Sequence, residues 1–78
     1  MRAQRRLELT AVECRERIVR HLRGRGGWVP LADLIPFLDE LGCNRSSGDR
    51  YLRDLVLTGR VERTHADGLR GFRYRVSQ

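Results

Sequence analysis

The stretch GCNRSSGDRYLRDLVLTG, from Gly42 to Gly59, decides how this chain folds. Asn44 or Ser46 can cap a helix at its start and Gly59 can end it, so we expect a helix over about residues 45–58. Its apolar and small residues recur at helical spacing, which predicts an inward stripe of Gly48, Tyr51, Leu52 and Leu55. That packing leaves several arginines outside, and the question is whether they are only solvated or contact a negatively charged partner.

A longer helix is predicted upstream, from Ala11 to Arg23. Thr10 and Glu13 have the spacing of a capping box, in which each side chain bonds the other residue's backbone N–H. Glycines within residues 24–27 should end this helix. Its inward stripe is predicted to consist of Ala11, Cys14, Ile18 and Leu22.

The segment between the two helices predicts a short strand and a short helix. Trp28 and Val29 favour a strand, and Pro30 restricts it to an edge position because proline lacks an N–H. We expect Trp28 to cover one end of the core. The following LADLIPFLDELG has helical spacing, with Asp33 as the N-cap and Pro36 in the first turn, where a missing N–H costs little.

The C-terminal part changes from a period of 3.6 residues to a period of two. RVERTH and FRYRVS alternate like strands, and Asp67-Gly68 between them is a strong hairpin signal, so we predict a hairpin over 60–77. The expected fold is mainly α with a small antiparallel β-hairpin. It forms one domain, 10–78, preceded by a basic N-terminal arm, 1–9.

The composition favours an anionic partner. The 78 residues carry a net charge of +6 at a sequence pI of about 10.9. All 16 basic residues are arginines, so every positive charge is a planar guanidinium that can bind phosphate or a base edge through two bonds. Nucleic acid is therefore the first partner class to consider.

Other function classes have little support in the sequence. No apolar run approaches the ~20 residues of a membrane span, and no signal peptide precedes Cys14 and Cys43, so we expect a cytoplasmic chain with two free, buried cysteines. His21 and His65 have neither metal-ligand spacing to these cysteines nor a nucleophile beside them. We expect no enzyme activity, no metal and no cofactor.

Two segments resemble a known family. LDELGCNRSSGDRYLRDLVLTGRVER is similar to the helix-turn-helix of bacterial and bacteriophage winged-helix transcriptional regulators, and GFRYRV resembles their returning wing strand. The resemblance runs from about Thr10 to Val76 and implies a three-helix winged helix-turn-helix. Gly48 stands where the family usually has valine or isoleucine, and Pro36 interrupts the second helix. The glycine should weaken the helix by about 1 kcal/mol relative to alanine and loosen its packing.

The resemblance implies sequence-specific binding of double-stranded DNA by a small transcriptional regulator. The helix over about 45–58 would enter the major groove, and the hairpin would act as the wing. We place Arg45, Ser47, Asp49 and Arg50 nearest the base edges and Arg53 on a phosphate. A short half-site favours a homodimer or tandem sites. The complete set of expected DNA contacts is Arg45, Ser46, Ser47, Asp49, Arg50, Arg53, Arg63, Arg70 and Arg73.

Two alternatives stay open. The arginines can be a solvated surface, with Arg50 and Asp54 forming an ordinary i,i+4 pair. The same fold can instead be a protein–protein interaction module, for example a phage-encoded factor that docks on host or assembly machinery, with Leu57 or Trp28 as apolar anchor. Asp49 and Asp54 favour this second alternative because both would repel phosphate.

Overall fold

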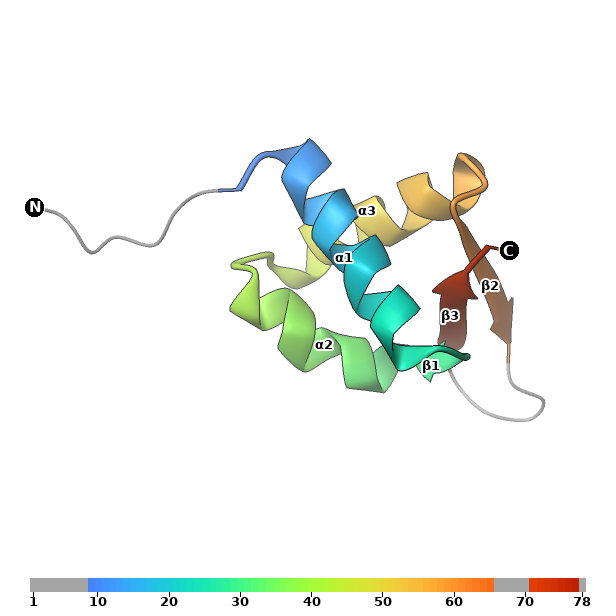
Figure 1. The fold of residues 1–78 in the computed structure, drawn as a ribbon. Helices are drawn as coiled ribbons and strands as arrows, with labels where there is room; N and C mark the ends of the chain where they lie inside the picture. Colours follow the sequence, from blue (N-terminus) through green and yellow to red (C-terminus); the bar gives the residue numbers. More distant parts are fainter. Residues whose placement is uncertain (1–8, 66–70, 78) are drawn as a thin grey trace, which may run out of the picture.

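The computed structural model describes residues 9–65 and 71–77 (Figure 1). Three helices and a small three-stranded antiparallel sheet form the molecule, which confirms the prediction of a mainly α fold with an antiparallel hairpin. Most of the basic arm, the predicted Asp67-Gly68 turn and Arg70 lie outside the described residues. The elements are α1 (Ala11–Arg25), β1 (Val29–Pro30), α2 (Leu31–Glu40), α3 (Arg45–Leu57), β2 (Val61–His65) and β3 (Phe72–Val76).

The start of α1 is the predicted capping box. Thr10 Oγ1 accepts a hydrogen bond from the Glu13 N–H at 3.1 Å, and Glu13 Oε1 accepts one from the Thr10 N–H at 2.9 Å. The helix runs two residues past its predicted end at Arg23, through Gly24. It stops at Gly26, whose φ of +76° is the left-handed conformation that closes helices. The position of the left-handed glycine, and not the first glycine, therefore sets the end of α1.

The predicted start of α2 is wrong. The helix begins at Leu31, directly after β1, and Asp33 forms an ion pair with Arg25 at 3.5 Å instead of capping it. Pro36 consequently lies in the middle of the helix and not in its first turn. It is tolerated there because Pro36 and Ala32, whose carbonyl would have accepted the missing bond, are both exposed to water.

The start of α3 is capped by Asn44, whose Oδ1 accepts a hydrogen bond from the Ser47 N–H at 2.8 Å. Gly48 is buried, as predicted, but it does not loosen the packing. A Cβ at this position would lie 2.8 Å from Leu38 Cδ1, so glycine is what lets α3 approach α2 this closely. The departure from the family pattern is therefore a packing feature of the α2–α3 contact.

The sheet has the strand order β1-β3-β2, so the predicted hairpin gains β1 as a third, edge strand. Tyr74 of β3 pairs with Val29 on one side and with Arg63 on the other. Val29 and Tyr74 are buried against the helices, and alternation along β3 turns Arg73 and Arg75 to the opposite, outer face.

The core lies between the three helices and the inner face of the sheet. Its largest fully buried side chains are Ile18, Leu22, Leu34, Leu52, Leu55, Val29 and Val61. Cys14 and Cys43 are free and buried there, as predicted, with their Sγ atoms 3.8 Å apart. None of the helices in the described ranges is long and apolar enough to cross a membrane.

Candidate nucleic-acid interface

The exposed side of α3 carries most of the residues expected to contact DNA. Arg45, Asp49 and Arg53 follow one another at four-residue spacing, so they share one side of the helix, and Arg50 lies next to them. All four are exposed, as is Ser46, whereas Ser47 is half-buried. The buried residues Gly48, Leu52 and Leu55 hold the opposite side of α3 against the core and thereby fix the direction of the arginines.

The N-terminal end of α3 offers fewer free donors than the sequence suggests. Asn44 already accepts the hydrogen bond of the Ser47 N–H. Of the first-turn N–H groups, those of Arg45 and Ser46 remain without an intrahelical partner because they precede the first helical bonds. An anion at this end would meet these two N–H groups, the Ser46 hydroxyl and the Arg45 guanidinium.

Asp49, Tyr74 and Arg63 come together where α3 meets the hairpin. Burial raises the pKa of the Tyr74 phenol; the neighbouring Arg63 guanidinium opposes this rise and the Asp49 carboxylate adds to it. The pKa of the Tyr74 phenol thus depends on one charged side chain from α3 and one from β2. Asp49 therefore lies on the side of α3 that faces the hairpin, and we call the surface of Arg45, Asp49, Arg50, Arg53 and Arg63 the α3–hairpin face.

Arg63 is held by aromatic side chains near the turn end of the hairpin. Its Cζ lies 4.4 Å from the centroid of the Phe72 ring, and His65 stacks on the same ring with centroids 4.2 Å apart. Such cation–π and stacking contacts limit the rotamers that Arg63 can adopt. The guanidinium is consequently presented in a defined place beside α3, although β2 itself is an exposed edge strand.

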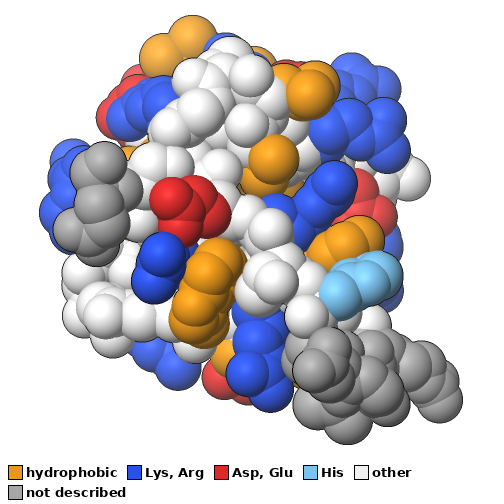
Figure 2. All heavy atoms as spheres, turned by 90° about the vertical axis from the view of Figure 1, so that its right-hand side faces the viewer, with side chains coloured by type: hydrophobic (Ala, Val, Ile, Leu, Met, Phe, Trp, Pro, Cys, Tyr) orange, Lys and Arg blue, Asp and Glu red, His pale blue; other side chains and the backbone are white. Residues whose placement is uncertain are grey.

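The outer face of the sheet holds a different cluster. Arg73 lies there, away from the α3–hairpin face, opposite Thr64 and Pro30. Arg75 beside it bonds Glu62 Oε1 through Nε at 2.7 Å, and its Cζ lies 4.4 Å from the Trp28 ring centroid. Trp28 is 38% exposed, so the expectation that it covers one end of the core is wrong. Figure 2 views this side of the molecule and shows acidic side chains among the arginines.

Four arginines elsewhere in the described ranges are paired with carboxylates, namely Arg15, Arg25, Arg60 and Arg75, whereas Arg17, Arg20, Arg23 and Arg73 are in none of these ion pairs. Asp54, expected to pair with Arg50, lies instead 3.6 Å from Arg15 of α1. Arg60 bonds both carboxylate oxygens of Glu16, at 2.5 and 3.2 Å. No carboxylate among residues 9–65 and 71–77 forms an ion pair with an arginine of the α3–hairpin face. The four arginines of that face therefore have no ion-pair partner, and Asp49 within the face reduces its positive charge without cancelling it.

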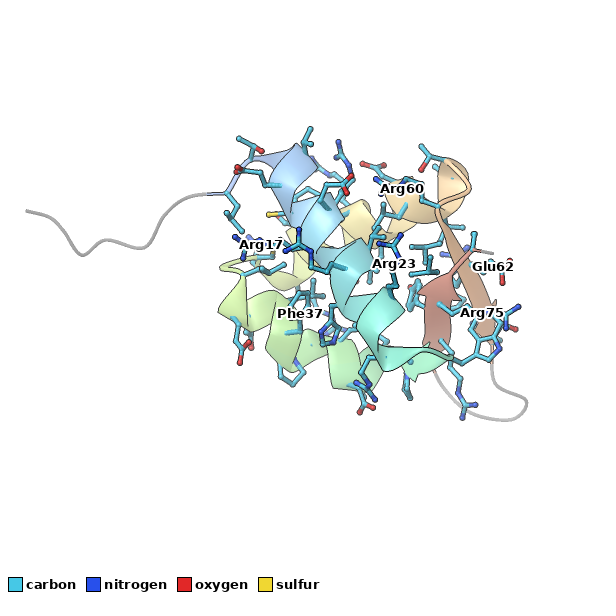
Figure 3. The ribbon with its side chains drawn as sticks, viewed as in Figure 1. Arg17, Arg23, Phe37, Arg60, Glu62 and Arg75 are labelled. Atoms are coloured by element: carbon cyan, nitrogen blue, oxygen red, sulfur yellow. The ribbon has the colours of Figure 1, made fainter. Side chains whose placement is uncertain are left out.

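The exposed arginines of α1 were not among the expected contacts. Arg17, Arg20 and Arg23 recur every three residues on the solvent side of the helix, and Figure 3 shows Arg17 and Arg23 extending from α1. Their spacing relative to the buried stripe could have identified them. Glu16 lies close enough to Arg20 and Arg23 for both to lower its pKa, after the larger effect of Arg60. This side of α1 is thus of mixed charge.

Comparison with family models, curated proteins and solved structures finds no match for this chain. Within the part of the chain that the structure describes, no three histidine, cysteine or carboxylate side chains gather as metal ligands would. The feature that indicates a function is the α3–hairpin face, whose arginines form no ion pair with a described carboxylate.

Proposed function

We propose that this chain is a winged helix-turn-helix protein that binds double-stranded DNA, with α3 in the major groove and the β2–β3 hairpin as the wing. One observation carries the proposal: the arginines of the α3–hairpin face have no carboxylate partner among the described residues, whereas Arg15, Arg25, Arg60 and Arg75 each have one. The order of three helices and a terminal antiparallel hairpin is compatible with this fold. A small transcriptional regulator in the cytoplasm would have these properties.

The position of each residue suggests its role. Arg50 lies on the outward side of α3, where a guanidinium can bridge O6 and N7 of a guanine. Arg53, one turn from Asp49 on the hairpin side, is placed for a phosphate, as is Arg63 in the middle of β2. Asp49 can accept a hydrogen bond from a cytosine amino group, and its carboxylate would disfavour other bases there.

The remaining expected contacts surround this centre. Arg45 and Ser46 would hold a phosphate at the N-terminal end of α3, and Ser47 would support them from its half-buried position. Arg73 would contribute only along the outer side of the wing, because it lies on the other face of the sheet. Arg70 falls outside the described residues, and its contact stays a prediction from the sequence.

The salt dependence of binding tests the proposal. Selection from a random duplex library yields a probe, whose affinity is then measured by fluorescence anisotropy as salt is raised. We expect log K to fall linearly with log salt, and each removed phosphate contact to reduce the slope by about 1. Arg53→Ala should show that reduction, and Arg25→Ala, which changes the net charge equally at an arginine paired with Asp33, should not. No binding at low salt, or a flat response to salt, would contradict the proposal.

An acidic protein is the second candidate partner, and Asp49 within the arginine face favours it because a carboxylate repels phosphate. The two partners differ in a simple experiment. A DNA-binding chain is retained on a heparin or DNA column at about 100 mM salt through counterion release. A chain that passes through both columns yet binds an acidic protein would support docking in place of DNA binding.

A further inference from the structure

A groove of about 430 Å³ lies between α1 and the C-terminal end of α3, apart from the α3–hairpin face. Leu57, the last residue of α3, borders it and keeps 75% of its surface exposed. On α1, Val12 is 59% exposed and lies one turn before Arg15, which also borders the groove. We call this surface the α1–α3 groove, lined by Arg15, Asp54, Leu55, Leu57, Thr58 and Arg60.

The apolar side chains of Leu57 and Val12 stay largely uncovered by the rest of the described residues. Among the residues that the structure describes, three large hydrophobic side chains are exposed: Val12, Trp28 and Leu57. Trp28 is covered in part by the Arg75 guanidinium, whereas Leu57 of α3 lines the groove, and Val12 lies on α1 one turn before Arg15, which also lines it. A protruding leucine next to a groove is the kind of apolar anchor that contacts between proteins use.

The charges at the groove cancel. Arg15 pairs with Asp54, and Arg60 pairs with Glu16 at its rim, so two positive and two negative side chains stand around the apolar residues. Arg60 lowers the pKa of Glu16 through their hydrogen bond, and Arg20 and Arg23 of α1 lower it further. The charged side chains that line the groove, together with Glu16, carry no net charge, on a chain whose net charge is +6.

We propose that the α1–α3 groove is the contact between two copies of this chain. Two chains of charge +6 repel each other wherever their arginine-rich surfaces meet, and least where the local charge is zero. A twofold contact brings a surface against itself, so it requires equal numbers of both charges. Here Arg15 and Arg60 of one copy can face Asp54 and Glu16 of the other, while each Leu57 enters the opposite groove.

The same charges disfavour the other occupants. Asp54 and Glu16 would repel the phosphates of DNA, and their pairing with Arg15 and Arg60 leaves no unsatisfied positive charge for an acidic protein. A second copy is the partner whose charge pattern this surface complements.

The contact would also set the geometry of DNA binding, a consequence that rests on the proposed function. Leu57 ends α3, so the C-terminal ends of two α3 helices would meet near the twofold axis and their Asn44 ends would point away from it. Each N-terminal half could then reach one half-site of a palindromic sequence. Dimerisation itself needs no DNA and can be measured alone.

Sedimentation velocity without DNA, from micromolar to submillimolar concentration, tests the proposal. We expect the wild-type mass to rise from 9.1 kDa towards twice that value. Leu57→Asp should stay monomeric over this range, because the dissociation constant of its dimer should be at least roughly tenfold higher. Val12→Glu should weaken the dimer too, and it leaves the fold intact because glutamate is favourable in the first turn of a helix. Circular dichroism confirms that both variants are folded.

Trp28→Gln is the matched control, since it removes an exposed apolar side chain beside β1 and not from the groove. It should dimerise like the wild type. A wild type that stays at 9.1 kDa at every concentration overturns the proposal, as does a folded Leu57→Asp variant that still dimerises. Because the assay contains no DNA, these outcomes leave the proposed function untouched, and loss of DNA binding leaves the dimer untouched.

Discussion

The α3–hairpin face and the α1–α3 groove share one helix and both contain arginines, but the surroundings of those arginines are opposite. Arg50, Arg53 and Arg63 have no carboxylate partner among the described residues, whereas Arg15 and Arg60 are each paired with one from a distant part of the chain. The number of arginines is therefore a poor guide to what a surface binds. The placement of a few carboxylates decides which arginines can serve an external phosphate.

The largest effect should come from the residue that holds α3 in place for both surfaces. Gly48→Val adds atoms where a Cβ alone would lie 2.8 Å from Leu38 Cδ1. We expect the free energy of unfolding to fall by about 2–3 kcal/mol, because overpacking forces buried neighbours to move. Urea denaturation measures this change.

Gly48→Ala is the control for that variant. Alanine regains about 1 kcal/mol of helix propensity, which offsets the shift of the Leu38 side chain, so the stability should stay within about 1 kcal/mol of the wild type. A Gly48→Val variant as stable as the wild type would show that α2 and α3 do not approach this closely.

The next effect separates unpaired arginines from a paired one. Arg50→Ala and Arg53→Ala should each weaken DNA binding by roughly tenfold, about 1.4 kcal/mol, because each removes a charged contact. Arg25→Ala lowers the net charge by the same amount but should change the affinity by about twofold or less, since Arg25 is paired with Asp33. Anisotropy titrations at one salt concentration compare the three. Equal losses in all of them would mean that only net charge matters.

A smaller effect reports the junction between α3 and the hairpin. Burial raises the pKa of Tyr74, so this phenol should titrate above the ordinary tyrosine value of 10.0 in a spectrophotometric titration. Asp49→Asn should lower the pKa of Tyr74 and Arg63→Gln should raise it.

The sign for stability follows from the same shift. Folding raises the pKa of Tyr74, so the free energy of unfolding of the protein falls as the pH rises above the ordinary tyrosine pKa of 10.0. Tyr74→Phe should therefore flatten the alkaline end of the stability curve. If neither charge variant moves the titration, Asp49 and Arg63 do not meet at Tyr74.

The smallest effect concerns the paired arginine of the groove. The Arg60 guanidinium lowers the pKa of Glu16 below its ordinary value of 4.5. The contribution of the Glu16 carboxylate to the stability of the fold is complete above pH 4.5 and is lost as the pH falls through the lowered pKa. Glu16→Gln should thus give a shallower loss of stability in acid, measured by thermal unfolding between neutral and acid pH. An identical acid profile in both proteins would argue against the pair.

The sequence predicted what depends on near neighbours along the chain. The capping box at Thr10, the inward position of Gly48 and the hairpin strands all follow from spacings of a few residues, and all are present in the structure. The start of α2 was misplaced because Asp33, a good N-cap by type, has Arg25 as a partner instead. Local preference was overridden there by a contact with another helix.

The candidate site was predicted less completely, for a related reason. Arg60 and Glu16 lie 44 residues apart in the sequence, and no residue spacing predicts that they form an ion pair. The i,i+4 spacing on α3 predicted an ion pair between Asp54 and Arg50. In the structure α1 packs beside α3, and Asp54 pairs with Arg15 of α1 instead. The arginines that lack an ion-pair partner can therefore be identified only from the folded structure. The direction in which the α3 arginines point could be predicted from the buried stripe of α3.

The two cysteines make the opening of the core directly measurable. Cys14 and Cys43 are buried, and burial together with the neighbouring Cys14 thiol raises the pKa of Cys43 to about 11. Thiol reagents attack the thiolate, so Cys43 in the folded chain should react far more slowly than in the unfolded chain. The rate at which a thiol reagent labels the native protein would then report how often α1 separates from the α2–α3 turn, without any introduced probe.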